Sequence, residues 1–439
     1  MSATLSDTGP TPAIPETAAL TTAAVPGLSA SGTLAPASPS PLAKQAKLTK
    51  ESRPHVIAFD LIRLIIMVFV VSVHTLAFGG GQVTVVLGAF TTVFHTSREL
   101  FFLLTALVLT YNYGHRRNVR WLAFWRRRYW LVVPAYVAWS AIYFAADGHW
   151  PGSAGAVATA FWHDLLTAGA RYHLYFLLVT MQVYLLFPVL RWVLRKTEGH
   201  HVALFLAACV YQLALTAAIQ HHPVHSGPLV GWLNGAGQGI WLESYVLYIV
   251  GGAIAGWHFD QLRAFTAKHA SAATIALSVG VGVAVGLGMY FAQLARGASP
   301  AAASAVFQPV VVVEALAFGW ALLAAGLLWA DRGAPNRKFF AAGSASSFGI
   351  YLAHPLVLQG LLAVASTTGV LAAVRGAPAG LEVLVLLGVA VPLIYGASWM
   401  IASAARRTPL SLMLTGREYS ARKRQTGATR SQKEPQAQP

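Results

Sequence analysis

The sequence predicts an all-α fold: a polytopic membrane helical bundle of about ten transmembrane helices, with both termini cytoplasmic. Three observations lead to this prediction. Of the 439 residues, 56% are hydrophobic and only 10% are charged, whereas a soluble protein usually has about 25% charged residues. Apolar runs long enough to cross a bilayer recur along the chain. The lysines and arginines are divided unevenly between the gaps that separate these runs.

The apolar runs divide the chain into two tails and one membrane domain. Residues 1–53 are rich in Ala, Pro, Thr and Ser and bury too little apolar surface to fold, so we expect a disordered cytoplasmic tail. A transmembrane domain over 54–405 follows, and 406–439 is expected to be a basic cytoplasmic tail, disordered after about Ser420. The expected spans lie near 56–78, 88–112, 121–145, 172–194, 202–219, 238–257, 271–292, 306–330, 345–366 and 381–404.

The positive charges orient these spans. With ten spans, 26 of the 31 lysines and arginines lie on one side and only Arg171, Arg296 and Arg375 on the other. This asymmetry places both termini in the cytoplasm. The net charge of +16 is therefore a topology signal, and we expect no nucleic-acid partner. Cys209 is the only cysteine, which excludes a disulfide or a cysteine-based zinc site within one chain, and no metal site is expected.

The first span carries three ionisable groups inside an apolar run. At about 100° per residue, Asp60, Arg63, Met67 and His74 fall within roughly 60° of one another on one helix face. At about 1.5 Å per residue, His74 lies roughly 21 Å along the axis from Asp60, in the outer half of the membrane. Asp60 and Arg63 could pair near the inner surface while His74 makes a simple hydrogen bond. Three such groups on one face favour a functional site.

Glu99 opens the second span at a depth similar to that of His74. A carboxylate that accepts the imidazole N–H would fix the tautomer of His74 and raise its basicity. The alternative is an Arg98–Glu99 pair that neutralises itself at the interface.

Basic and imidazole side chains recur in three later spans. Arg126, Arg127 and Arg128 at the inner end of the third span are typical of a topology anchor, but guanidinium groups also suit the phosphates of an acyl-CoA. His173 enters from the outer side at the fourth span. His354 precedes Pro355 in the ninth, where it marks either a structural kink or a polar group facing the same cavity as His74.

Several of these stretches, in order, resemble the acyltransferase-3 family of integral membrane acyltransferases. The resemblance covers roughly residues 54–405, and Arg128 alone matches the family's Arg-x-x-Arg pair, because Leu131 stands at its second position. The matching stretches are Asp60, Arg63 and His74; Phe101 to Ala106; Arg126 to Tyr136; His173 to Leu177; and Tyr351 to Pro355.

The resemblance implies an O-acyltransferase of the bacterial plasma membrane. It would move an acyl group, commonly acetyl, from cytoplasmic acyl-CoA to a hydroxyl of an exported or cell-surface glycan, lipid or small molecule. His74, oriented by Glu99, would act as general base or carry the acyl group. Arg63, with Asp60 beside it, would stabilise the oxyanion or hold the donor. Arg126, Arg127 and Arg128 would attract the CoA phosphates, and His173, Tyr175, Tyr351 and His354 would contact the substrate.

Two other functions fit the composition. A proton-coupled transporter or flippase would also use intramembrane Asp, Arg, Glu and His, although the sequence shows no internal repeat. A non-catalytic membrane scaffold would leave these charges without a purpose.

Overall fold

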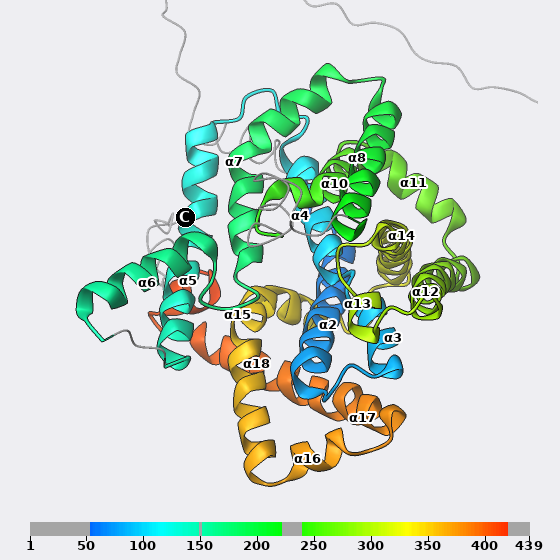
Figure 1. Cartoon of the computed structure of the whole chain (residues 1–439). Coiled ribbons are helices and arrows are strands. Elements are labelled where there is room, and N and C mark those ends of the chain that lie inside the picture. The colour runs from blue at the N-terminus through cyan, green and yellow to red at the C-terminus, as the bar shows by residue number, and fades with distance from the viewer. Residues whose placement is uncertain (1–52, 149–151, 222–238, 420–439) are drawn as a thin grey trace, which may run out of the picture. The chain divides into compact units, whose positions relative to one another are not determined.

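The computed structural model describes residues 53–148, 152–221 and 239–419 (Figure 1). Helices dominate these residues, and no strand occurs among them. The helices are α2 (Ala58–Gly79), α3 (Val85–Phe94), α4 (Ser97–Tyr113), α5 (Trp121–Ala146), α6 (Ala154–Thr167), α7 (Tyr175–Lys196), α8 (His201–His221), η1 (Leu242–Tyr245), α10 (Val246–Trp257), α11 (Phe259–His269), α12 (Ala272–Ala295), α13 (Pro300–Ala303), α14 (Pro309–Asp331), α15 (Arg337–Thr367), α16 (Val370–Arg375), α17 (Ala379–Val385), the π-helical turn η2 (Leu386–Ala390), α18 (Val391–Ala405) and α19 (Ser411–Thr415).

The prediction of a polytopic helical bundle is confirmed. In the described part of the chain, nine helical segments are long and apolar enough to cross a membrane, and each coincides with a predicted span. The predicted span at 238–257 is a shorter apolar helix, Leu242–Trp257. Its 16 residues reach about 24 Å, less than the roughly 30 Å of a bilayer core. The cytoplasmic location of the termini stays a prediction.

Small residues allow this short helix to lie directly against α4. A Cβ atom built on Gly252 would lie 2.1 Å from the carbonyl oxygen of Leu103, and one on Gly256 would lie 2.4 Å from that of Leu107. Glycines four residues apart present one smooth stripe on a helix, which lets two backbones approach closely. The α4–α10 contact therefore depends on the absence of side chains at these two positions.

Two glycines four residues apart, Gly282 and Gly286, also allow α12 to pack closely against α14. The Phe318 ring lies against Gly282, and the carboxylate of Glu314 lies against Gly286. The outward faces of the bundle remain apolar: Leu206 and Val210 on α8 and Leu277 on α12 are more than half exposed. Faces of this kind are suited to lipid.

Helix α2 is the element that positions the site. It packs against α15, α14, α3, α4 and α18 (Figure 1). Its C-terminal carbonyls, which no later turn can satisfy, accept hydrogen bonds from the Arg375 guanidinium at Phe78 (3.0 Å) and Gly79 (3.1 Å). Glu382 then accepts the N–H of Gly81 at 2.9 Å. These contacts fix the end of α2 near His74.

The chain that follows the last span is not wholly a tail. Residues 406–419, which the sequence assigns to the C-terminal tail, include α19, which packs on α5, α15 and α18. Ser411 and Thr415 are buried, and the Trp139 indole N–H donates to the carbonyl of Leu414 at 3.1 Å. Residues 1–52 and 420–439, the remainder of the two predicted tails, lie outside the described residues.

Candidate active site

The polar face of α2 lies against α15. Near one end, the Arg63 guanidinium donates to the Ser344 hydroxyl at 3.4 Å. Near the other, the His74 ring lies 5.4 Å from that of His354, measured between ring centroids. Because both residue numbers rise together, the two helices run parallel. The predicted alignment of Arg63 and His74 on one face is therefore confirmed, and that face is turned to one neighbour.

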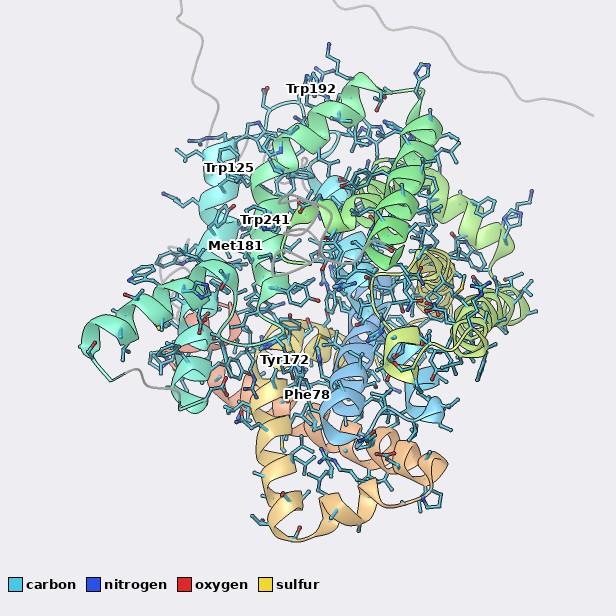
Figure 2. The ribbon with its side chains drawn as sticks, viewed as in Figure 1. Phe78, Trp125, Tyr172, Met181, Trp192 and Trp241 are labelled. Atoms are coloured by element: carbon cyan, nitrogen blue, oxygen red, sulfur yellow. The ribbon has the colours of Figure 1, made fainter. Side chains whose placement is uncertain are left out.

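Two aromatic rings pack against His74. The centroid of Tyr172 lies 4.6 Å from that of His74, and His354 stacks on it with an interplanar angle of 26°. Tyr172 is itself stacked on Phe78, 4.5 Å away, and Figure 2 shows the two beside each other near the end of α2. The imidazole of His74 is thus held by packing and not by a charged partner.

His74 lines a cavity of about 150 Å³. The volume corresponds to roughly five water molecules at about 30 Å³ each. Its walls combine polar and aromatic side chains from α2, α4, α7 and α15 and the loops between helices: His74, His95, Ser97, Arg98, Phe101, His173, Tyr175, Phe176 and Tyr351, with Val70, Val73, Ala77 and Val306. The imidazole therefore faces a small space lined by polar groups.

Proline fixes the tautomer of His354. In a regular helix the carbonyl of Tyr351 would accept the N–H of residue 355, but Pro355 has none. The Nδ1 atom of His354 lies 2.7 Å from that carbonyl and donates to it. Its Nε2 atom is then the unprotonated acceptor, and it is buried without a hydrogen-bond partner among the described residues. The kink stays a prediction, and His354 lies against the His74 ring but is not among the side chains that line the cavity.

His173 and Tyr351 form the adjoining wall. His173 is buried, with its ring centroid 5.4 Å from that of His354 and 5.1 Å from that of Tyr351. The Tyr351 hydroxyl donates to the His173 backbone carbonyl. Tyr175 lines the cavity as well. The structure therefore brings His173, Tyr175, Tyr351 and His354 together around His74.

The predicted Glu99–His74 pair is not formed. The carboxylate of Glu99 instead accepts hydrogen bonds from its neighbour Arg98, with Nε 3.0 Å from Oε1. Glu99 is buried and does not line the cavity, whereas Arg98 does. An adjacent guanidinium on the same helix turn reaches this carboxylate more easily than a ring on another helix. The alternative Arg98–Glu99 pair is the one that the structure contains.

His95 is also part of the site, although the sequence pattern does not mark it as a site residue. It lies directly after α3, and its ring lines the cavity beside that of His74. Its Nδ1 atom is buried and has no partner in the described part of the chain. The signal in the sequence was the short polar break His95-Thr96-Ser97 within an apolar run, which separates α3 from α4.

A second polar group lies at the opposite end of α2, here called the Asp60 end. Asp60 is buried and is bonded to His55, with Oδ2 2.8 Å from Nε2. Arg63 lies close enough to Asp60 and Arg128 to interact with both. Of the three predicted donor-binding arginines, Arg126 and Arg127 are exposed, whereas Arg128 is half-buried and lies near the Tyr184 ring.

The two ends are separated by packed side chains. Arg63 and His74 lie about 17 Å apart along the helix axis, and neither Arg63 nor Arg128 lines the His74 cavity. Met67, between them on the same face, is fully buried in a cluster with Val132 and Ile350. A second cavity of about 300 Å³ lies on the Ile62 and Ile66 face of α2, and none of its lining side chains is titratable.

These features define a polytopic membrane protein with a buried imidazole site at one end of its central helix and a guanidinium group at the other. The chain belongs to the Acyl_transf_3 family: residues 56–401 match its acyltransferase domain. The protein is therefore a multi-pass membrane acyltransferase. No match was found among curated proteins or among solved structures. Among the described residues, no group of three or more His, Cys, Asp or Glu side chains has the geometry of a metal site.

Proposed function

We propose that this protein transfers a short acyl group, acetyl in the simplest case, from cytoplasmic acyl-CoA to a hydroxyl of an exported acceptor. The acceptor would be a glycan, lipid or small molecule at the bacterial plasma membrane. The observation that carries the proposal is the position of His74: a half-buried imidazole, in contact with two rings, that lines a small cavity whose walls include polar side chains.

The size of the cavity supports a short acyl group. Pockets that enclose a drug-sized ligand measure about 300–1,000 Å³, whereas this one measures about 150 Å³. An acetyl group and one hydroxyl fit such a space, and the remainder of a glycan or lipid acceptor would lie outside it. The cavity is therefore large enough for the reacting hydroxyl group but not for a whole glycan or lipid acceptor.

His74 is suited to act as the general base. Its neutral ring takes the proton of the acceptor hydroxyl, and the hydroxyl oxygen forms a bond to the acyl carbon. The carbon–sulfur bond of the thioester then breaks, and CoA leaves as a thiol once its sulfur takes up a proton. Arg98 and Tyr175 line the same cavity and offer N–H and O–H donors to the developing oxyanion. His354 would act as a positioning residue through its stacked ring.

Arg63 would hold the donor and not the oxyanion. Its distance of about 17 Å along the helix from His74 excludes action of both side chains on the same atom. With Arg128, it would bind the phosphates of CoA at the Asp60 end, while the extended pantetheine arm carries the thioester toward His74.

Labelled acetyl-CoA supplied to the purified protein in liposomes tests this function. We expect label to move to a hydroxyl acceptor, and His74→Ala to lower the rate by about 10²–10⁴-fold, the usual contribution of a general base. His163→Ala, which alters an exposed histidine on α6, is the matched control. Intact-protein mass spectrometry shows whether His74 itself carries acetyl. Movement of a solute without transfer of label would support a transporter instead.

A further inference from the structure

Arginines from four separate segments meet at the Asp60 end. Arg63 and Arg128 come from α2 and α5, Arg406 follows α18, and Arg417 follows α19. Two of them bond to neighbouring hydroxyls of α15: Arg63 to Ser344 at 3.4 Å, and Arg406 to Ser346 at 3.3 Å. Guanidinium groups from α2 and from the segment after α18 therefore both bond to the same turn of α15.

The backbone around Gly416 brings Arg417 to this place. Gly416 has φ +60°, a left-handed conformation that glycine adopts without strain. An ideal Cβ there would lie 2.4 Å from the Phe348 ring and 2.8 Å from the carbonyl oxygen of Leu131. Phe348 lies one helical turn after Ser344, and Leu131 lies one turn after Arg128. The chain at Gly416 therefore packs against α5 and α15 one helical turn from Arg128 and Ser344, and Ser411 holds it there by donating to the carbonyl of Arg417 at 2.8 Å.

Acidic groups do not balance this charge. Among the residues that the structure describes, Asp60 is the carboxylate that interacts with Arg63 and Arg417, and it is already bonded to His55. Arg417 is exposed on one side, and desolvation of its guanidinium, together with the charges of Arg406 and Arg63, lowers its pKa. Like charges held together at a protein surface destabilise it unless an anion binds between them. This arrangement of guanidinium groups is suited to bind an anion.

We propose that Arg406 and Arg417, on the segment after the last span, complete with Arg63 and Arg128 a binding site for the phosphate groups of a nucleotide-bearing thioester. Guanidinium forks bind phosphate oxygens in pairs, which suits several arginines to a ligand with several phosphates. This inference rests on the proposed function for the identity of the donor. It assigns part of donor binding to residues 406–417, which lie beyond the matched acyltransferase domain.

Binding of CoA to the full-length protein in phosphatidylcholine nanodiscs tests the inference by calorimetry. We expect Arg406→Gln and Arg417→Gln each to weaken CoA binding about tenfold, the loss of one charged hydrogen-bonding partner. Arg407→Gln, which alters an exposed neighbour, should leave affinity unchanged. Pantetheine, which lacks the phosphates, should bind all four proteins alike. Arg417→Lys should recover only part of the affinity, because lysine keeps the charge but not the fork.

The outcomes separate this inference from the proposed function. Suppose that the unaltered protein binds CoA and transfers acetyl. If Arg406→Gln and Arg417→Gln then bind CoA as tightly as Arg407→Gln does, the C-terminal arginines do not bind the phosphates. If CoA binds as expected but no acetyl is transferred, the proposed function fails and the site remains.

Anionic phospholipid is the other source of phosphate. If phosphatidylglycerol nanodiscs reduce the affinity of the unaltered protein for CoA to that of Arg417→Gln, the site holds lipid headgroups and the inference is overturned. A melting curve for each variant confirms folding.

Discussion

The imidazole rings of His74 and His354 stack 5.4 Å apart across two parallel helices that are distant in the sequence. Each ring has a separate anchor. His74 lies against Tyr172, and His354 donates its Nδ1 proton to a carbonyl that Pro355 leaves free. The orientation of the proposed base therefore depends on the backbone of α15 as well as on α2.

Pro355→Ala tests that dependence. Alanine restores an N–H that can bond to the Tyr351 carbonyl, which competes with the Nδ1 proton of His354. We expect acetyl transfer to fall by about tenfold through a lower kcat with little change in KM for acetyl-CoA, since positioning of the base affects the chemical step. Pro134→Ala in α5, which also restores a helical N–H, is the control. Equal rates in the two variants would show that the bond from His354 to the Tyr351 carbonyl has no part in positioning the base.

Arg98 and Glu99 should behave as one buried unit. Removing either partner leaves the other charge buried and unpaired, which typically costs about 3–5 kcal/mol. We expect Arg98→Leu and Glu99→Leu each to lower the melting temperature strongly in detergent, and the double variant to melt above both. The double-variant cycle measures this coupling. Additive losses would mean that the hydrogen bonds between the two side chains contribute little to stability.

Met67 is the side chain that separates the arginines from the His74 cavity. A flexible thioether can change rotamer and let an extended pantetheine arm pass, whereas an indole cannot. We expect Met67→Trp to retain CoA binding and lose acetyl transfer, measured by calorimetry and by label transfer on the same preparation. Val68→Trp, on the exposed neighbouring position, should retain both. Normal transfer by Met67→Trp would place the route of the acyl group elsewhere.

The α4–α10 contact should tolerate no side chain at Gly256. Alanine there would place a methyl group within 2.4 Å of the Leu107 carbonyl oxygen, so the helices must separate. Overpacking of this kind costs about 1–3 kcal/mol, which should appear as a lower melting temperature. Gly280→Ala in α12, where an added Cβ meets open space, should be neutral or stabilising. A destabilised Gly280→Ala would point to a general intolerance of change in these helices.

Much of the fold could be predicted from local properties of the chain. Runs of apolar residues marked every long span, because the bilayer sets both the length and the polarity of a helix that crosses it. Helical periodicity placed Arg63 and His74 on one face, which was confirmed by their shared neighbour α15. The inward direction of Arg128, and the outward direction of Arg126 and Arg127, could not be derived from composition, since all three are arginines in one turn.

Contacts at the site depend on helix rotation, which the sequence does not give. Depth in the membrane leaves both His74 and Arg98 as possible partners of Glu99, and the structure pairs it with Arg98. His95 was passed over, although the break between α3 and α4 turns it into the cavity. Polarity places residues 406–419 in the C-terminal tail, and only the structure shows that α19 within them lies against α5 and α15.

The sequence by itself determined that this chain crosses a membrane many times, roughly where its long spans lie, and that charged groups share one side of the first span. These properties follow from the cost of polar groups in lipid and from the repeat of a single helix. Only the tertiary structure decided which rings enclose His74, which carboxylate stays apart from it and where the C-terminal arginines lie. Such choices depend on how helices rotate and pack against one another, and no helix carries that information alone.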